Sequence, residues 1–148
     1  MWRIPTVDDL KHTLSTREIE AYQAHNGSVD WKTAAEALVL RTATFVRGCV
    51  RSGGKTRMSP RAHEIPESLV SAAMDYCAYD VLKQLPVKIT EERKLARRDA
   101  VALFDKVAAG KYIPEDFASS EDSIKPASGV ELAQRSRLRA TPEKLEGL

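Results

Sequence analysis

The sequence is poor in aromatic residues, which make up only 6% of its 148 positions. A core with so few large rings must be filled mainly by Ala, Val and Leu, and this favours helices that pack closely over small side chains. The hydrophobic share of 43% and the charged share of 30% are ordinary for a globular protein. The length predicts one domain with one core.

Cysteines and long apolar runs are also scarce. Cys49 and Cys77 are the only cysteines; their wide spacing fits neither a disulfide framework nor a zinc site and predicts buried, reduced thiols. No window approaches the roughly 18 apolar residues of a membrane span, and the first residues lack the apolar run of a signal peptide. We therefore expect a protein with no membrane contact that is made in the cytosol.

Neither sign of charge dominates, because 23 basic and 21 acidic residues give a net charge of +2. The distribution is uneven, however: no Asp or Glu occurs between Glu36 and Glu64. That interval holds six cations, Arg41, Arg47, Arg51, Lys55, Arg57 and Arg61. Such a set suits contact with a DNA backbone or with an acidic protein surface. A merely solvated cationic face is the third interpretation.

Apolar periodicity and capping signals predict an all-α fold. We expect a small bundle of three long helices, at about 31–51, 66–84 and 91–109, preceded by two short N-terminal helices. Thr6 and Ser15 each begin a capping box, and Pro66 suits the first position of a helix. Phe45 and Leu95 fall on the predicted buried faces. No segment alternates convincingly with the period of a strand.

The character of the chain changes after Pro114. We predict a helical domain over 1–113 and a flexible C-terminal arm over 114–148, which becomes ordered on assembly. The arm is polar at first and then carries scattered Arg and Leu residues that are too few to fold alone. The predicted docking residues of this arm are Arg135, Arg137, Leu138, Arg139, Leu145 and Leu148.

No catalytic constellation is visible. The segment SGGKT at 52–56 is not a phosphate-binding loop, because the required first glycine falls on Cys49 and the segment follows a predicted helix. None of the three histidines is spaced for metal binding, and GxSxG is absent. We predict no metal site, no cofactor and no enzymatic activity.

Two helical patterns suggest a family. The second long helix carries Pro66, Leu69, Ala73, Asp75, Ala78, Tyr79 and Leu82, and the third ends with Ala100, Leu103, Val107, Ala108 and Gly110. The chain closes on Arg139, Thr141, Leu145 and Gly147. Over about 31–112 this arrangement resembles the small proteins that join head and tail in long-tailed bacteriophages and prophages. They include the Mu-type neck protein family and related head-completion or connector adaptors.

The resemblance implies a structural subunit of the virion neck, assembled in the host cytoplasm. Its copies would form a ring, twelvefold in the expected case, between the portal protein and a tail-side or stopper neck protein. DNA would pass through the ring, with the 41–61 cations facing either the channel or an acidic neighbour. The alternative is a stand-alone helical DNA-binding protein, although the 52–65 loop is too long for a helix-turn-helix.

Overall fold

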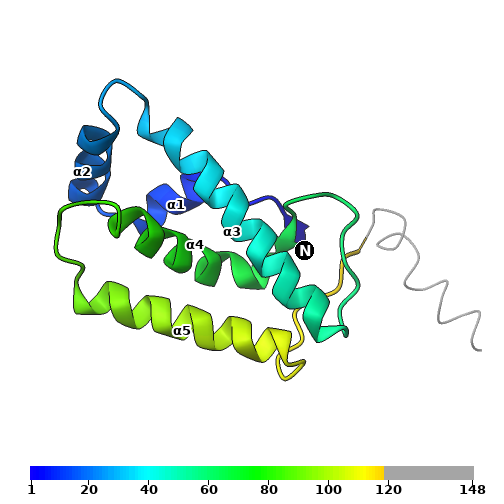
Figure 1. The fold of residues 1–148 in the computed structure, drawn as a ribbon. Helices are drawn as coiled ribbons and strands as arrows, with labels where there is room; N and C mark the ends of the chain where they lie inside the picture. The colour runs from blue at the N-terminus through cyan, green and yellow to red at the C-terminus, as the bar shows by residue number, and fades with distance from the viewer. Residues whose placement is uncertain (119–148) are drawn as a thin grey trace, which may run out of the picture. The chain divides into compact units, whose positions relative to one another are not determined.

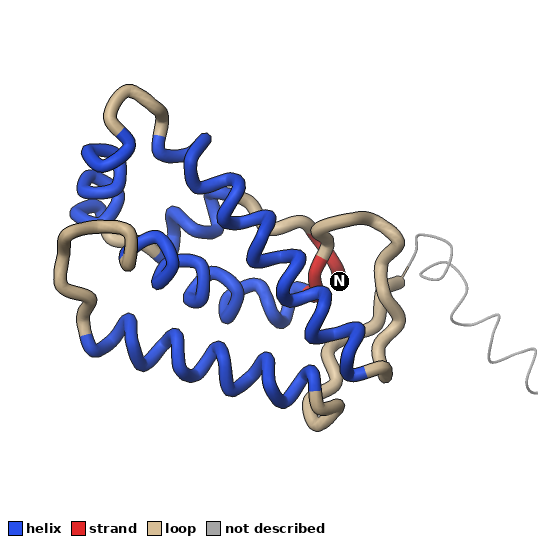
Figure 2. The backbone as a smooth tube through the Cα atoms, viewed as in Figure 1, coloured by secondary structure: helices blue, strands red, loops and turns tan. Residues whose placement is uncertain are grey.

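The computed structural model describes residues 1–118 of the chain. Helices dominate this range (Figure 1): α1 (Val7–Thr13), α2 (Thr16–Asn26), α3 (Trp31–Gly53), α4 (Glu67–Leu82) and α5 (Glu91–Ala108). Two very short strands, β1 (Trp2–Arg3) and β2 (Ile65–Pro66), lie together beside the N-terminus (Figure 2). The predicted all-α fold, with three long helices after two short ones, is therefore confirmed for the described residues.

Both predicted capping boxes are present. The Thr6 hydroxyl accepts the N–H of Asp9, and the Asp9 carboxylate accepts the N–H of Thr6 at 2.7 Å. Ser15 and Glu18 exchange the equivalent pair of hydrogen bonds at the start of α2. These reciprocal bonds satisfy amide groups that the first turn leaves without partners, so the local sequence fixes where α1 and α2 begin.

The central helix of the bundle is α4, which lies between α3 and α5 in Figure 1 and also packs against α1. Its buried apolar residues cover most of its circumference: Leu69, Val70, Ala73, Met74, Cys77, Ala78, Val81 and Leu82. The small alanines let the neighbouring helices approach closely. Each large side chain among them contributes roughly 1.5–3 kcal/mol by burial, so α4 supplies much of the stabilising apolar contact.

The ends of α3 and α5 meet at a glycine. A Cβ atom on Gly53 would lie far inside the van der Waals contact distance of the Val107 carbonyl oxygen. Gly54 ends α3 with a left-handed φ of 69°, and Gly110 follows α5 with a φ of 75°, a conformation that glycine adopts easily after a helix. The close approach of the two helix ends therefore depends on the absence of a side chain at position 53.

The pairing of β1 with β2 was not predicted. The strands are antiparallel, with Trp2 opposite Pro66 and Arg3 opposite Ile65. This pairing also corrects the expected role of Pro66, which precedes α4 instead of beginning it. Its ψ of 136° is extended because it belongs to the strand, and α4 starts at Glu67.

Two residues expected on buried faces are substantially exposed: Phe45 by 43% and Leu95 by 48%. On α5 the contact with the bundle is made by Ala100, Phe104 and Val107. Leu95 precedes Phe104 by nine residues, a rotation of about 180° around the helix, so it faces away from the core. The prediction for Leu95 was wrong because only part of α5's apolar surface packs against α4.

The compact unit extends to Phe117, beyond the predicted boundary at residue 113. Pro114 is buried, and the Trp2 indole N–H donates to the carbonyl of Glu115 at 2.8 Å. The Glu115 carboxylate accepts the N–H of Ser68 at 3.0 Å, and the ring of Phe117 meets that of Trp2 edge-on at 6.4 Å. Residues 114–117 are therefore part of the folded body, because the β1–β2 region supplies partners for them.

Candidate functional site

The six cations of the 41–61 interval do not form a single patch. Arg41 and Arg47 are six residues apart on α3, a rotation of about 240° around its axis. Arg41 faces solvent and makes no ion pair with the described residues, whereas Arg47 is partly buried. Arg51 is exposed near the end of α3. These cations are close in the sequence, but Arg41 and Arg47 project from different sides of α3.

Arg47 holds the loop between α3 and β2. Its guanidinium donates to the carbonyl of Glu64 at 2.8 Å and to the carbonyl of Ser59 at 2.9 Å. It also lies over the ring of Trp2, 5.9 Å from the ring centroid. Burial and the nearby charge of Arg51 lower the pKa of Arg47. These contacts occupy N–H donors of Arg47 that a hydrogen bond to a DNA phosphate would require.

The same loop is folded around a buried carboxylate. The Glu64 side chain is only 8% exposed, accepts a hydrogen bond from the Ser59 hydroxyl and pairs with Arg61 at 3.4 Å. Ser59 Oγ in turn accepts the N–H of Arg61 at 3.1 Å. His63, between them in the chain, has a φ of 69° and lies 3.3 Å from the hydroxyl of Thr44. Arg61 thus has a structural partner inside the loop.

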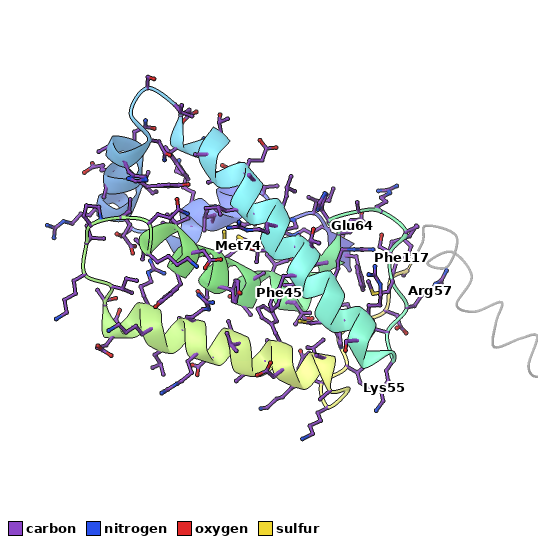
Figure 3. All side chains as sticks on the ribbon, viewed as in Figure 1. Phe45, Lys55, Arg57, Glu64, Met74 and Phe117 are labelled. Carbon is purple, nitrogen blue, oxygen red and sulfur yellow. The ribbon has the colours of Figure 1, made fainter. Side chains whose placement is uncertain are left out.

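Lys55 and Arg57 join this loop to the segment after α5. Lys55 Nζ donates to the carbonyl of Gly110 at 3.2 Å. The backbone N–H of Arg57 donates to Asp116 at 2.8 Å, and the carbonyl of Arg57 accepts the N–H of Phe117 at 2.9 Å. Figure 3 shows Lys55, Arg57 and Phe117 at the same end of the bundle. We call residues 55–64, with these partners, the loop clamp.

A separate pocket lies where α3, α4 and α5 meet, near the middle of the bundle, where Figure 3 labels Phe45. Its volume is about 380 Å³. Its lining, which we call the cation–aromatic pocket, consists of Arg41, Thr42, Phe45, Tyr76, Asp80, Lys83 and Arg97. Three cationic side chains and one carboxylate give it a formal charge of +2.

Stacked rings form the apolar part of this pocket. Phe45 stacks on Tyr76 with centroids 5.1 Å apart and planes inclined by 15°, and both rings meet Phe104 edge-on. The guanidinium of Arg97 lies 4.0 Å from the ring centroid of Tyr76 and 4.8 Å from that of Tyr79. The rings hold the cation in place by cation–π attraction, while nearly half of Phe45 stays open to solvent.

Asp80 organises the cations of the pocket. Its carboxylate lies 3.4 Å from Arg97 and 3.2 Å from Lys83, and its side chain is 12% exposed. Within residues 1–118, Arg97 Nε is a buried side-chain donor without a hydrogen-bond partner. Two cations share one carboxylate here, and Arg41 adds a third positive charge, so the pocket retains positive charge that can attract an anionic group.

The sequence interpretation missed most of this pocket. It placed Phe45 in the core, whereas Phe45 is 43% exposed, and it did not single out Arg97, which contacts Asp80 of α4. The signal that was present is the spacing of Arg41 and Phe45, four residues apart and therefore on one face of α3. The contribution of Lys83 depends on how α4 and α5 pack, which no local pattern reveals.

A larger groove, of about 900 Å³, runs between α2, the loop after α4 and the start of α5. One wall is the ion pair of Arg93 with Glu18 at 2.6 Å. Burial alone raises the pKa of Glu18, but hydrogen bonds from Arg93 and from Ser15 outweigh it and lower that pKa. Arg93 and Glu18 therefore already have partners in the fold.

The cysteine thiols are free, and neither is activated. Burial raises the pKa of Cys77 to about 11 and also raises the pKa of Cys49, which disfavours the nucleophilic thiolate. Among residues 1–118 no group of three or more His, Cys, Asp or Glu side chains could hold a metal ion. No helix in this part of the chain is long and apolar enough to span a membrane.

The six predicted docking residues of the C-terminal arm, from Arg135 to Leu148, lie outside the described residues. The described part defines a class, a small all-α bundle with a loop clamp at one end and a charged aromatic pocket at its middle. Comparison with protein-family models, with curated proteins and with solved structures found no match for the chain.

Proposed function

We propose that this protein is a structural head-to-tail adaptor, or connector, subunit of a tailed bacteriophage or prophage. In this proposal its copies form a ring beneath the portal protein and above a tail-side or stopper neck protein. DNA passes through the ring, and the protein resides in the neck of the virion after assembly in the host cytoplasm. It is not an enzyme in this proposal.

The observation that carries the proposal is the position of the residues on which the family resemblance rests. Leu69, Ala73, Ala78 and Leu82 of α4 are buried, as are Ala100 and Val107 of α5. The resemblance is thus a pattern of helix packing around α4 and extends over two consecutive helices. A shared packing pattern supports a shared bundle, and the adaptor role follows from the resemblance by analogy.

The contacts of the basic interval favour an adaptor over a stand-alone DNA-binding protein. Arg47, Lys55 and Arg61 are engaged with carbonyl groups or a carboxylate of the chain itself. Non-specific binding to duplex DNA depends on several cations that can neutralise phosphates together. A ring does not need strong binding by each subunit, because DNA only passes through it.

The test is assembly. The full chain should be mixed with the portal protein encoded beside it, and the mixture compared with each protein alone by negative-stain electron microscopy and native mass spectrometry. We expect rings of the chain on the portal. Lys11→Ala, an exposed change on α1, is the control that should assemble normally. If the chain does not bind the portal at any ratio, the proposal is wrong.

A further inference from the structure

We propose that the cation–aromatic pocket receives the outer face of α5 from a second copy of this chain. The inference rests on the adaptor proposal, because it names the contact by which neighbouring subunits of the ring would join. The pocket offers positive charge around a half-exposed aromatic ring. Its occupant should therefore combine carboxylates with an apolar side chain.

The chain itself presents such a surface. Leu95 is 48% exposed on α5, and Glu91 and Asp99, four residues before and after it, are exposed on the same side. The three side chains form a row about 12 Å long, with the apolar group between two carboxylates. We call this row the acidic ridge. Glu91 also contacts Lys94 at 3.3 Å, but its side chain is 88% exposed, so that pair is weak.

Charge and apolar surface match between the two sites. In the proposed contact Leu95 packs against Phe45, and the carboxylates of the acidic ridge approach Arg41 and Lys83. Both apolar groups lose exposed surface, and opposite charges meet at the rim of the contact. Arg97 remains bound to Asp80 and to the tyrosine rings, so it holds the shape of the pocket.

The two sites lie on opposite sides of one helix. Arg97 points toward α4 and the pocket, whereas Leu95, two residues earlier, is rotated by about 200° and points away. One copy therefore cannot fill its own pocket with its own acidic ridge. Joining the pocket of one copy to the ridge of the next is a head-to-tail contact, and repeating such a contact produces a ring or an open filament.

A protein occupant explains the pocket better than a nucleic acid does. Asp80 limits the positive charge at the pocket, and Lys55 and Arg57 of the loop clamp lie at one end of the bundle, away from the pocket near its middle (Figure 3). A bound strand requires cations that follow its backbone from one phosphate to the next. The pocket instead concentrates its cations around one apolar ring, which suits a single inserted side chain with acidic neighbours.

Charge reversal tests the contact with the full chain. Arg41→Glu should weaken self-association about tenfold, and so should the double variant Glu91→Lys with Asp99→Lys, because each places like charges together. Mixing the two variants should restore association, since the pocket that carries the Arg41→Glu substitution then faces a basic ridge. Analytical ultracentrifugation measures the dissociation constants, and circular dichroism verifies that each variant is folded. Leu95→Ser should also weaken association. Its matched control is Val87→Ser, at a residue that is similarly exposed (45%), and this control should leave association unchanged.

Zero-length carbodiimide crosslinking tests which groups meet. In a mixture of ¹⁴N- and ¹⁵N-labelled chains, we expect mixed-isotope crosslinks between Lys83 and Glu91 or Asp99. Lys83→Arg keeps the charge but has no reactive amine, so it should preserve association and lose this crosslink.

The outcomes separate this inference from the adaptor proposal. If rings form on the portal but Arg41→Glu changes nothing and Lys83 crosslinks elsewhere, the inference is wrong and the adaptor proposal stands. If the pocket and ridge join copies that never bind the portal, the inference stands and the adaptor proposal fails. Oligonucleotide binding by the wild type that Phe45→Ala abolishes, without any effect on self-association, would also overturn the inference.

Discussion

Removing the side chain of Arg47 should destabilise the protein strongly, although this residue belongs to a cationic interval that suggests ligand binding. Its guanidinium donates to two loop carbonyls, those of Ser59 and Glu64, in a partly buried position. Arg47→Ala leaves both acceptors without a donor and removes a cation from the ring of Trp2. The loop clamp then loses its main attachment to α3.

The magnitude follows from the two hydrogen bonds. Each bond from a charged donor contributes roughly 1.5–3 kcal/mol, and we take the lower value because water can reach part of the site, so the loss is about 3 kcal/mol. For a folded unit of this size the melting temperature falls about 4 °C per kcal/mol, so we expect a decrease of about 12 °C. Arg47→Lys should lose about half as much free energy, because a single ammonium cannot reproduce the forked geometry.

Urea denaturation followed by circular dichroism measures the free energy of unfolding. Arg41→Ala is the matched control on the same helix. At a protein concentration where the chain is monomeric, it should change that free energy by less than about 0.5 kcal/mol, because Arg41 is exposed and forms no ion pair with the described residues. The loss for Arg47→Ala should also be insensitive to salt, since the acceptors are neutral carbonyls. Equal effects of the two substitutions would refute the assignment of Arg47 to the loop clamp.

Three further predictions concern other parts of the fold. Gly53→Ala should lower the free energy of unfolding by about 1–3 kcal/mol, because the added methyl group would overlap the Val107 carbonyl. Gly48→Ala is the control: its methyl group would meet open space, so it should raise that free energy by about 0.5–1 kcal/mol in the same urea assay. Hydrogen bonds from Arg3 lower the pKa of Asp9 to about 2, so its contribution is present above pH 4 and is lost as pH falls toward 2. Asp9→Asn should therefore flatten the pH dependence of stability in that window, and an unchanged profile would contradict the pairing. Cys49 should react with a thiol reagent at pH 8 before Cys77, whose pKa is about 11 and which is buried; simultaneous reaction would disprove this.

Helix starts were predictable because their signals are local. Each capping box exchanges its hydrogen bonds within one turn, between Thr6 and Asp9 or between Ser15 and Glu18. Three or four neighbouring residues therefore determine where each of these helices begins. The pairing of Arg3 with Ile65 has no such signal. Its strands are two residues long, too short to show alternation, and their partners are far apart in the chain. Such contacts become visible only when the bundle brings the segments together.

The candidate site shows the same division. The sequence identified a basic interval, but whether each cation is available depends on its rotation around α3 and on the acceptors that the loop brings near it. The Arg47 side chain donates to carbonyl groups of the loop. Arg41 instead lines the pocket together with Lys83, at the end of α4, and Arg97 of α5. Tertiary packing therefore decided the composition of the pocket, and local spacing predicted only the pair of Arg41 and Phe45.

The hydrogen bond from the Trp2 indole to Glu115 joins positions 113 residues apart. Closing so long a chain segment has a large entropic cost, whereas α4 and α5 are consecutive helices that can meet through a short connection. We therefore expect the N-terminal strand to dock late in folding. During synthesis on the ribosome, the N-terminal residues emerge first, but they can form this contact only after almost all of the described chain has been made.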